Sequence, residues 1–399
     1  MEVISIENAE LVQTAAQKTQ VGLNQVLINK VNAMLARKTD SVKATIARME
    51  AEGKLMQDYL APIGVNLKEA GSRPVVTFSS NGAVNMDFVQ GLQRNHFSLH
   101  DNAVSQLATK MNIPTRYLRN LASGTEWEKQ LAAHILNEHS GNTERSRVLI
   151  RTVGNQVRGV LSDSYKRLNS QQILEAFITE AISYEASIAD ALYTDTKLYV
   201  ETILPTPIVI NTRKNGEIVM FAGARLSTSD FGDGALDMRA FLLNGACLNG
   251  MVRESLHRQV HLGGKLQDGI SFSDETYKKD SETTVSAIRD LTRMLYDKEA
   301  IMEKAMEINK ACEVEVDLNK ELKGLLKAAS LQKAEVECVE KILMANNPND
   351  GVQGESTLWK LTQAITAHAR NLAEAPEPQP RRARELQELC GSLLQRVHA

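Results

Sequence analysis

The chain lacks most of the features that mark specialised classes of protein. Aromatic residues make up only 5% of its 399 residues, and the formal net charge is only −3. A nearly neutral chain does not attract polyanions through its overall charge, so any affinity for nucleic acid must come from a local patch. No run approaches the ~18 apolar residues of a membrane span, and the start, MEVISIE, is not a signal peptide. We therefore expect a cytoplasmic protein without a membrane partner.

Cysteine is also scarce, and its spacing excludes several kinds of site. The four cysteines are Cys247, Cys312, Cys338 and Cys390. They lie far apart, without the spacing of metal ligands or of a secreted disulfide framework. Cys247 lies in an apolar run, where a buried inert thiol is commoner than a catalytic nucleophile. We predict reduced thiols and no catalytic cysteine.

Signals for bound phosphate or metal are weak. No GxxxxGK[ST] loop is present, because Gly263-Gly264-Lys265 is only the last part of one. His257 and His261 are four residues apart, which on a helix would place both on one face as a metal pair. The glycines that follow close that segment at once, which disfavours the metal pair. We therefore expect no cofactor and no metal.

A loop rich in hydroxyl groups and glycine spans residues 227–234. Its residues bond readily to their own backbone or tolerate left-handed dihedrals, so the loop has a defined shape. Asp230, Asp233 and Asp237 lack the spacing of a calcium loop, which favours turn capping. An enzyme that uses this loop stays open as an alternative.

The apolar pattern predicts an α+β fold in four parts. Helical spacing with a break near Thr39-Asp40 predicts a helical arm over residues 1–64, for oligomerisation or as a flap over the core. Strand-like runs joined by short turns predict a central, largely antiparallel sheet with packed helices over 65–270. Helices continue the core over 271–375. A Pro-rich spacer and a tail helix, which would seek a partner surface or fray, occupy 376–399.

Two short helices are expected within residues 97–121, around a stop at Asn112-Ile113-Pro114. On pattern alone they fit a helix-turn-helix that enters a DNA groove. Only Arg116, Arg119 and Asn120 would face the groove, so an ordinary packed helical corner is favoured.

The clearest predicted element is a β-hairpin. Residues 147–153 and 156–161 are β-rich runs, and Gly154-Asn155 between them fits a type II′ turn, which needs glycine first. A regular ladder then places Arg151 opposite Arg158. Like charges directly across a strand pair destabilise a sheet by up to ~1 kcal/mol. An anionic partner is therefore expected beside them.

Basic side chains gather on this hairpin and its exit turn, with a tyrosine beside them. Such a surface holds a single strand when phosphates take the charges and a base stacks on the ring. We predict a non-enzymatic protein that binds single-stranded nucleic acid, as a homo-oligomer. The predicted contact residues are Arg147, Arg151, Arg158, Tyr165, Lys166, Arg167 and Arg225.

The alternative is that the arginines pair with acids of the same chain. Glu299, Glu303 and Glu307 of the C-terminal helices are candidates, since surface charges are usually solvated or internally paired. The protein would then act in assembly or host takeover, through its helical surfaces.

Several ordered motifs give the chain a family resemblance. They are the hairpin leading into Ser162-Asp163-x-Tyr165, the strand end Arg225-Leu226-Ser227, the turn Cys247-x-Asn249-Gly250 and the helix 359–366. Over about residues 73–370 the chain resembles phage and plasmid proteins grouped as domain of unknown function 932. The resemblance implies a bacterial host cytoplasm and a role in mobile-element DNA metabolism. The β-hairpin followed by a helix also resembles single-strand annealing proteins at the level of fold, which implies annealing or recombination. One departure from the 932 family is Asn244, where relatives often carry an arginine; if that arginine contacts a ligand in relatives, the contact is missing or altered here.

Overall fold

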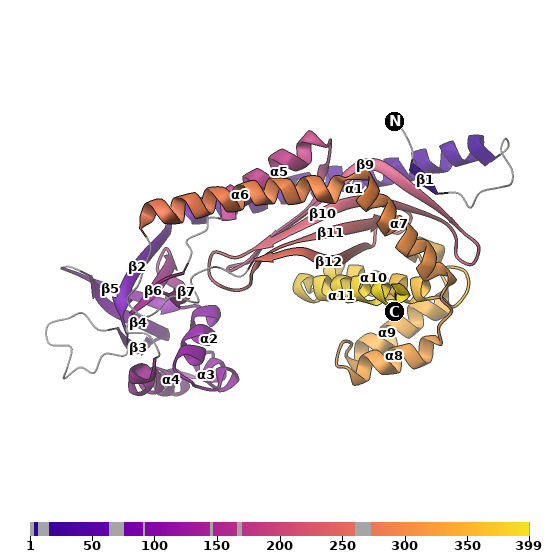
Figure 1. Cartoon of the computed structure of the whole chain (residues 1–399). Coiled ribbons are helices and arrows are strands. Elements are labelled where there is room, and N and C mark those ends of the chain that lie inside the picture. Colours follow the sequence, from indigo (N-terminus) through magenta and orange to yellow (C-terminus); the bar gives the residue numbers. More distant parts are fainter. Residues whose placement is uncertain are drawn as a thin grey trace.

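The computed structural model describes residues 4–6, 16–63, 76–90, 92–143, 147–165, 170–259 and 273–398. Within these ranges the chain is α+β, as predicted, with helical segments near both ends (Figure 1). The strands form two six-stranded sheets rather than one central sheet. None of the helices in these ranges combines the length and the apolar run that crossing a membrane requires.

The first sheet, here called the hairpin sheet, lies at the left of Figure 1. Its order is β2-β6-β7-β5-β4-β3, antiparallel except where β5 pairs with β7. Three helices bury their apolar faces against it. The elements are β2 (Met56–Pro62), β3 (Thr77–Asn81), β4 (Ala83–Gln90), β5 (Gln93–Leu99), α2 (Asp101–Lys110), α3 (Thr115–Ala122), α4 (Glu126–His139), β6 (Arg147–Val153) and β7 (Gln156–Ser162).

The second sheet, here called the long sheet, has the order β1-β9-β10-β11-β12, and β8 also pairs with β9. Its neighbours are antiparallel except β1 and β9. Helices α5 and α6 pack on it through a shared core. The elements are β1 (Ile4–Ile6), α5 (Ser170–Ser183), β8 (Ser187–Tyr193), β9 (Leu198–Thr212), β10 (Gly216–Thr228), β11 (Leu236–Asn244), β12 (Gly250–Gln259) and α6 (Asp274–Tyr296).

The C-terminal helices complete the core of the long sheet. Trp359 of α10 is 2% exposed and packs in one cluster with Ile218 and Met220 of β10. Leu386, Cys390 and other residues of the predicted tail helix are buried in the same cluster, so this helix finds its partner surface within the chain. The elements are α7 (Lys298–Glu313), α8 (Leu318–Lys327), α9 (Lys333–Ala345), α10 (Leu358–Glu374) and α11 (Pro380–Leu394).

A single helix, α1 (Ala16–Lys54), replaces the two helices predicted at the start of the chain. The predicted break at Thr39-Asp40 is wrong, because the Thr39 hydroxyl bonds to the Leu35 carbonyl at 2.9 Å and is satisfied within the helix. Val31 and Val42 of α1 are buried against the long sheet, and β2, which follows, joins the hairpin sheet. The segment predicted as an arm therefore connects the two sheets.

The predicted hairpin and helical corner are both present. Gly154 has a φ of 59°, while Asn155 has no positive φ, which fits the type II′ turn. Asn112, with a φ of 56°, follows the end of α2 in the left-handed conformation typical of helix ends. Leu107 of α2 and Leu118 of α3 are fully buried. The two helices thus form a packed corner.

Gly223 of β10 marks a close approach of two strands. A Cβ there would lie 1.8 Å from the Thr202 carbonyl oxygen of β9. Gly223→Ala should therefore force the strands apart and lower the free energy of unfolding by about 1–3 kcal/mol. Gly324→Ala in α8, where nothing lies within 4 Å of an added Cβ, should raise it by about 0.5–1 kcal/mol. Urea denaturation measures the free energy of unfolding of both variants. Equal changes in this free energy for Gly223→Ala and Gly324→Ala would contradict the close approach of the two strands.

Candidate functional site at the junction of the two sheets

The two hairpin arginines do not face each other as predicted. Arg151 pairs with Gly159, and a register shift before Thr152 leaves Arg158 as an extra residue in β7. This is a β-bulge, which opposes two residues to one. The prediction is wrong because it assumed a regular ladder.

Arg151 of β6 is held inside the protein. Its Nε and Nη2 donate to the two carboxylate oxygens of Asp58 at 2.7 and 2.8 Å, and its Nη1 donates to the Asp230 carbonyl at 2.6 Å. The residue is only 4% exposed. The bidentate pair joins β6 to β2 within the hairpin sheet, and the bond to Asp230, which follows β10, fastens this sheet to a loop of the long sheet.

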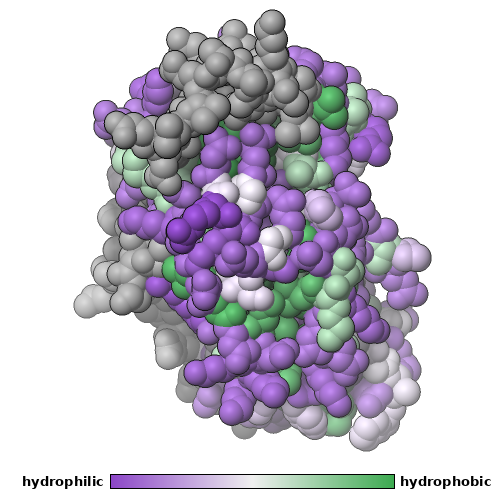
Figure 2. All heavy atoms as spheres, turned by 90° about the vertical axis from the view of Figure 1, so that its right-hand side faces the viewer, coloured by the Kyte–Doolittle hydropathy of each residue, from purple (hydrophilic) through white to green (hydrophobic). Residues whose placement is uncertain are grey.

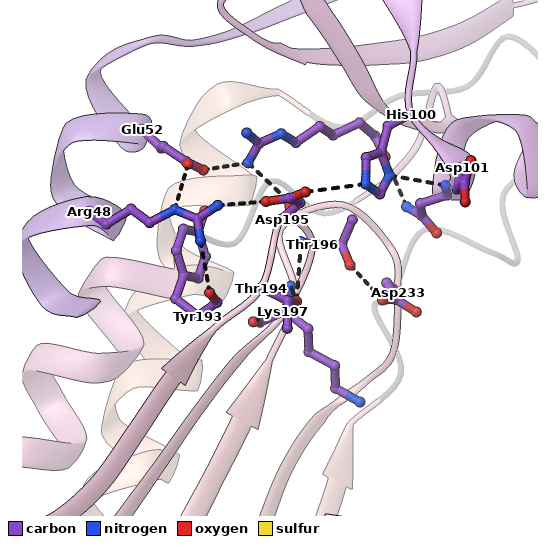
Figure 3. A network of polar contacts seen from close by, with 12 residues as sticks. Arg48, Glu52, His100, Asp101, Tyr193, Thr194, Asp195, Thr196, Lys197 and Asp233 are labelled. Carbon is purple, nitrogen blue, oxygen red and sulfur yellow. Dashed lines mark hydrogen bonds and ion pairs between the residues drawn. The ribbon is translucent and has the colours of Figure 1, made fainter. Parts of the chain in front are cut away.

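Arg158 is held in a second network, drawn in Figure 3. Its Nη1 donates to the Glu52 carboxylate of α1 and to the Asp195 carbonyl at 3.1 Å. Arg48 lies between the same two acids and donates to Glu52 at 3.0 Å and to Asp195 at 2.5 Å. Because Asp195 lies in the turn between β8 and β9, the network connects α1, the hairpin sheet and the long sheet.

His100 adds a link from the hairpin sheet to the same turn. Its Nδ1 accepts a hydrogen bond from the Asn102 N–H at 3.1 Å and caps α2, while its Nε2 lies 3.6 Å from Asp195 Oδ2 (Figure 3). Because Nδ1 is an acceptor, the neutral ring carries its proton on Nε2, directed to Asp195. The contact helps to hold the turn between β8 and β9 in place.

The remaining predicted contact residues are not gathered on one surface. Arg225 is 2% exposed and donates through Nε to Glu201 at 2.8 Å. The Tyr165 hydroxyl donates to the Ser229 carbonyl at 3.4 Å, and burial raises the pKa of the phenol. Arg147 is exposed at the start of β6. Tyr165 is half-buried, with its hydroxyl directed to the loop after β10.

Lys166 and Arg167 lie outside the described residues. The prediction is thus corrected: three of the predicted contact arginines, Arg151, Arg158 and Arg225, are each paired with a carboxylate of the same chain. The carboxylates are Asp58, Glu52 and Glu201, not the helical acids Glu299, Glu303 and Glu307 that the sequence suggested.

The acids of the loop 227–234 hold turns, as expected. The Asp230 carboxylate accepts from the Ser170 N–H at 2.9 Å at the start of α5, and Asp233 accepts from the Thr196 hydroxyl at 2.6 Å. The loop also lies close to the hairpin, since a Cβ on Gly159 would be 3.2 Å from the Phe231 carbonyl oxygen. Neither its acids nor its backbone is arranged as a catalytic set.

The other candidate groups lie partly within the described residues. His257 lies in β12, so the helical metal pair is wrong, and His261 and Gly263-Gly264-Lys265 lie outside the described residues. In the described part of the chain, no three His, Cys, Asp or Glu side chains are grouped to hold a metal ion. Cys247 is 1% exposed, and burial raises the pKa of its thiol to about 12, so it stays protonated.

Asn244 is buried, and its Nδ2 donates to Gln363 Oε1 of α10 at 3.0 Å. This position, where the resembled family often has arginine, is here part of the packing between β11 and α10.

A polar hollow of about 420 Å³, the junction cleft, lies beside the network of Figure 3. Its walls come from α2 and α3, the turn between β8 and β9, and the start of α11. The Ser105 hydroxyl in its wall donates to the Asp101 carbonyl of its own helix at 2.7 Å, so it is not activated by His100. The cleft offers hydrogen-bonding groups and charge, and no aligned nucleophile. Its ionic wall residues are Asp101, Arg119, Asp195, Lys197, Asp233 and Arg381.

A second hollow of about 690 Å³, the α1–α11 groove, has α1 on one side, α10 and α11 on the other and the long sheet as its floor. It shares Leu192 and Pro380 with the junction cleft. Its basic wall residues are Lys30, Arg37, Lys38, Arg370 and Arg384, and its acidic ones are Asp190, Glu201 and Glu374.

Sequence reasoning missed this groove. The spacing of Lys30, Arg37 and Lys38 places three cations on one face of a helix, and this signal was present in the sequence. The other wall comes from residues over 300 positions away in the chain, so pattern alone could not bring the two walls together.

Comparison of the chain with protein-family models, with curated proteins and with solved structures finds no match. The resemblance to the 932 family therefore stays a prediction.

Removing the Arg151 guanidinium tests its structural role. Arg151→Ala removes the bidentate pair with Asp58 and the bond to the Asp230 carbonyl from a buried place, so the free energy of unfolding should fall by about 3–5 kcal/mol. Arg147→Ala on the same strand, at an exposed position, should change it by less than about 0.5 kcal/mol. Chemical denaturation followed by circular dichroism measures both. Similar small losses would show that Arg151 is not structural.

The junction should also be sensitive to acid. Burial alone would raise the pKa of Glu52 and Asp195, but hydrogen bonds and charge from Arg158 and Arg48 hold them below their ordinary values of 4.5 and 3.8. Their contribution to stability is therefore present above the ordinary values and is lost as the pH falls through the lowered ones. Urea midpoints should drop across this acidic range. The urea midpoint of Glu52→Gln should be lower than that of the wild type at neutral pH and should change less as the pH falls. Parallel curves of midpoint against pH for the two proteins would contradict the role of Glu52.

Proposed function

We propose that the protein is a non-enzymatic binding protein that holds single-stranded nucleic acid along the junction cleft and the α1–α11 groove. The observation that carries the proposal is that the two hollows adjoin at Leu192 and Pro380 and that basic side chains line both. Adjoining hollows suit an extended ligand, and basic side chains along them suit its phosphates. The proposed site replaces the hairpin face, whose arginines are already paired.

Basic side chains of these hollows are exposed and only weakly paired, so they can bind a ligand, whereas the arginines of the hairpin are buried and firmly paired. Arg381 has a side chain 78% exposed and lies 3.9 Å from Glu385, a loose pair. Arg119 has a side chain 51% exposed and lies 3.3 Å from Asp101. Exposed pairs of this kind are worth about 0–1 kcal/mol, so a phosphate can replace the carboxylate at little cost.

The acids of the hollows do not prevent anion binding. Asp195 is neutralised by Arg48, and Asp190 lies 3.4 Å from Lys38 Nζ and accepts from Arg384 at 3.2 Å. Glu201 is bound to Arg225 beneath the groove. Three acids of the hollows, Asp190, Asp195 and Glu201, are therefore already compensated by cations of the same chain.

An assembly role through helical surfaces has one observation in its favour. Met306 of α7 and Leu326 of α8 have exposed fractions of 51% and 38%, as single apolar side chains on surface helices. Figure 2 shows the end of the molecule at the right of Figure 1, with a hydrophobic area in its lower middle bordered by hydrophilic atoms. Such an area suits contact with another protein surface.

Oligonucleotide binding across a salt series tests the proposal. A double variant, Arg37→Gln with Arg381→Gln, removes one cation from each hollow, and Lys43→Gln with Lys323→Gln is the matched control with the same charge change outside them. Fluorescence anisotropy of a labelled single strand should show weaker binding for the first variant. The slope of log affinity against log salt should fall by about 1.4, since each phosphate contact contributes ~0.7.

No binding at low salt, or equal effects of the two double variants, would contradict the proposal. Self-association of a protein that shows no oligonucleotide affinity would favour the assembly role instead.

A further inference from the structure

Two buried guanidinium groups at the α1–α11 groove have donors without acceptors. Arg384 of α11 lines the groove, and its side chain is 8% exposed; Arg225, below it, is 2% exposed. Among the described residues, neither Arg384 Nε nor Arg225 Nη1 has a hydrogen-bond partner. Buried donors are nearly always satisfied by protein, water or a bound group, and those of charged groups cost most when unsatisfied.

Both groups are fixed in place before any ligand arrives. Arg384 lies over the Tyr199 ring at 5.0 Å and donates through Nη2 to Asp190 at 3.2 Å. Arg225 is fixed by Glu201 and Gln387, both of which line the groove. The unsatisfied donors therefore belong to rigid side chains.

The charge beside these donors also favours an anion. Burial lowers the pKa of Arg225, Glu201 raises it, and the like charge of Arg384 lowers it again, with a net lowering. The nearest second acid is Glu388, 3.8 Å from Arg225 Nη1 and also paired with Arg239 at 3.2 Å. The two guanidinium groups repel each other. Their acids are also paired with other cations, Glu388 with Arg239 and Asp190 with Lys38, so the positive charge is not fully compensated.

The rest of this end of the groove suits an organic ligand with one anionic group. Phe241 and Leu243 provide an apolar floor, and Met34 adds apolar surface from α1. Lys38 lies on the same wall, with a side chain 43% exposed, and can turn its ammonium group from Asp190 to a ligand. The combination of an apolar floor with a few convergent donors is typical of small-ligand sites.

We propose that this end of the groove, formed by Arg384, Lys38 and Gln387 with Arg225 behind Gln387 and Glu201, binds a phosphate monoester. A phosphate monoester has three acceptor oxygens for the Arg384 and Lys38 donors and the Gln387 amide, whereas a carboxylate has only two oxygens. The monoester is either the terminal phosphate of a nucleic-acid strand, in which case the inference rests on the proposed function, or a free phosphorylated small molecule. Both sources share the chemistry of the site.

Calorimetric titration with ribose 5-phosphate and inorganic phosphate tests the free source. Wild-type protein should bind ribose 5-phosphate, and Arg384→Gln and Lys38→Gln should each weaken this binding roughly tenfold. Lys43→Gln, on α1 outside the groove, should leave it unchanged. Lys38→Gln keeps the test decisive if Arg384→Gln fails to fold, since Lys38 is only partly buried.

The strand source is tested by comparing 5′-phosphorylated and 5′-hydroxyl oligonucleotides of one sequence. A gain of at least about fivefold for the phosphorylated strand, lost in Lys38→Gln, assigns the site to strand ends. Equal binding of both strands with no ribose 5-phosphate binding overturns this inference and leaves the proposed function standing. Ribose 5-phosphate binding without oligonucleotide binding supports the inference and overturns the proposed function. If neither Arg384→Gln nor Lys38→Gln weakens the binding of ribose 5-phosphate or of the phosphorylated strand, the proposed phosphate site is overturned.

Discussion

Pairing of buried arginines with carboxylates of the same chain is the interaction on which the rest of the structure depends. Arg151 with Asp58 and Arg158 with Glu52 lie where the two sheets meet, and each pair has further bonds to a loop or turn of the long sheet. A charge at such a place is tolerated only when it is paired and hydrogen-bonded. The pairs therefore fix how the hairpin sheet and the long sheet lie relative to each other.

This constraint also decides where function can reside. A guanidinium group bound on every nitrogen, as in Arg151, cannot serve a ligand without loss of the junction. Accessible basic groups line the junction cleft and the α1–α11 groove, which lie where the two sheets and α1 come together.

Much of the fold was predictable because it is recorded in local patterns. The turn Gly154-Asn155, the corner at Asn112 and the helix that begins near Trp359 each follow from residues adjacent in sequence. The unbroken α1 was missed because a back-bonded Thr39 looks like a helix boundary in sequence. The bulge at Arg158 and its pairing with Glu52, 106 positions earlier, depend on tertiary contacts that periodicity does not contain, and the site prediction failed with them.

A double-mutant cycle on Arg158 and Glu52 tests the central claim most directly. The free energies of unfolding of Arg158→Ala, Glu52→Ala and the double variant, each measured by urea denaturation against the wild type, give the coupling between the two side chains. A junction held by this pair requires a favourable coupling of about 1–3 kcal/mol. Losses that add within about 0.3 kcal/mol would show that the pair does not hold the sheets together.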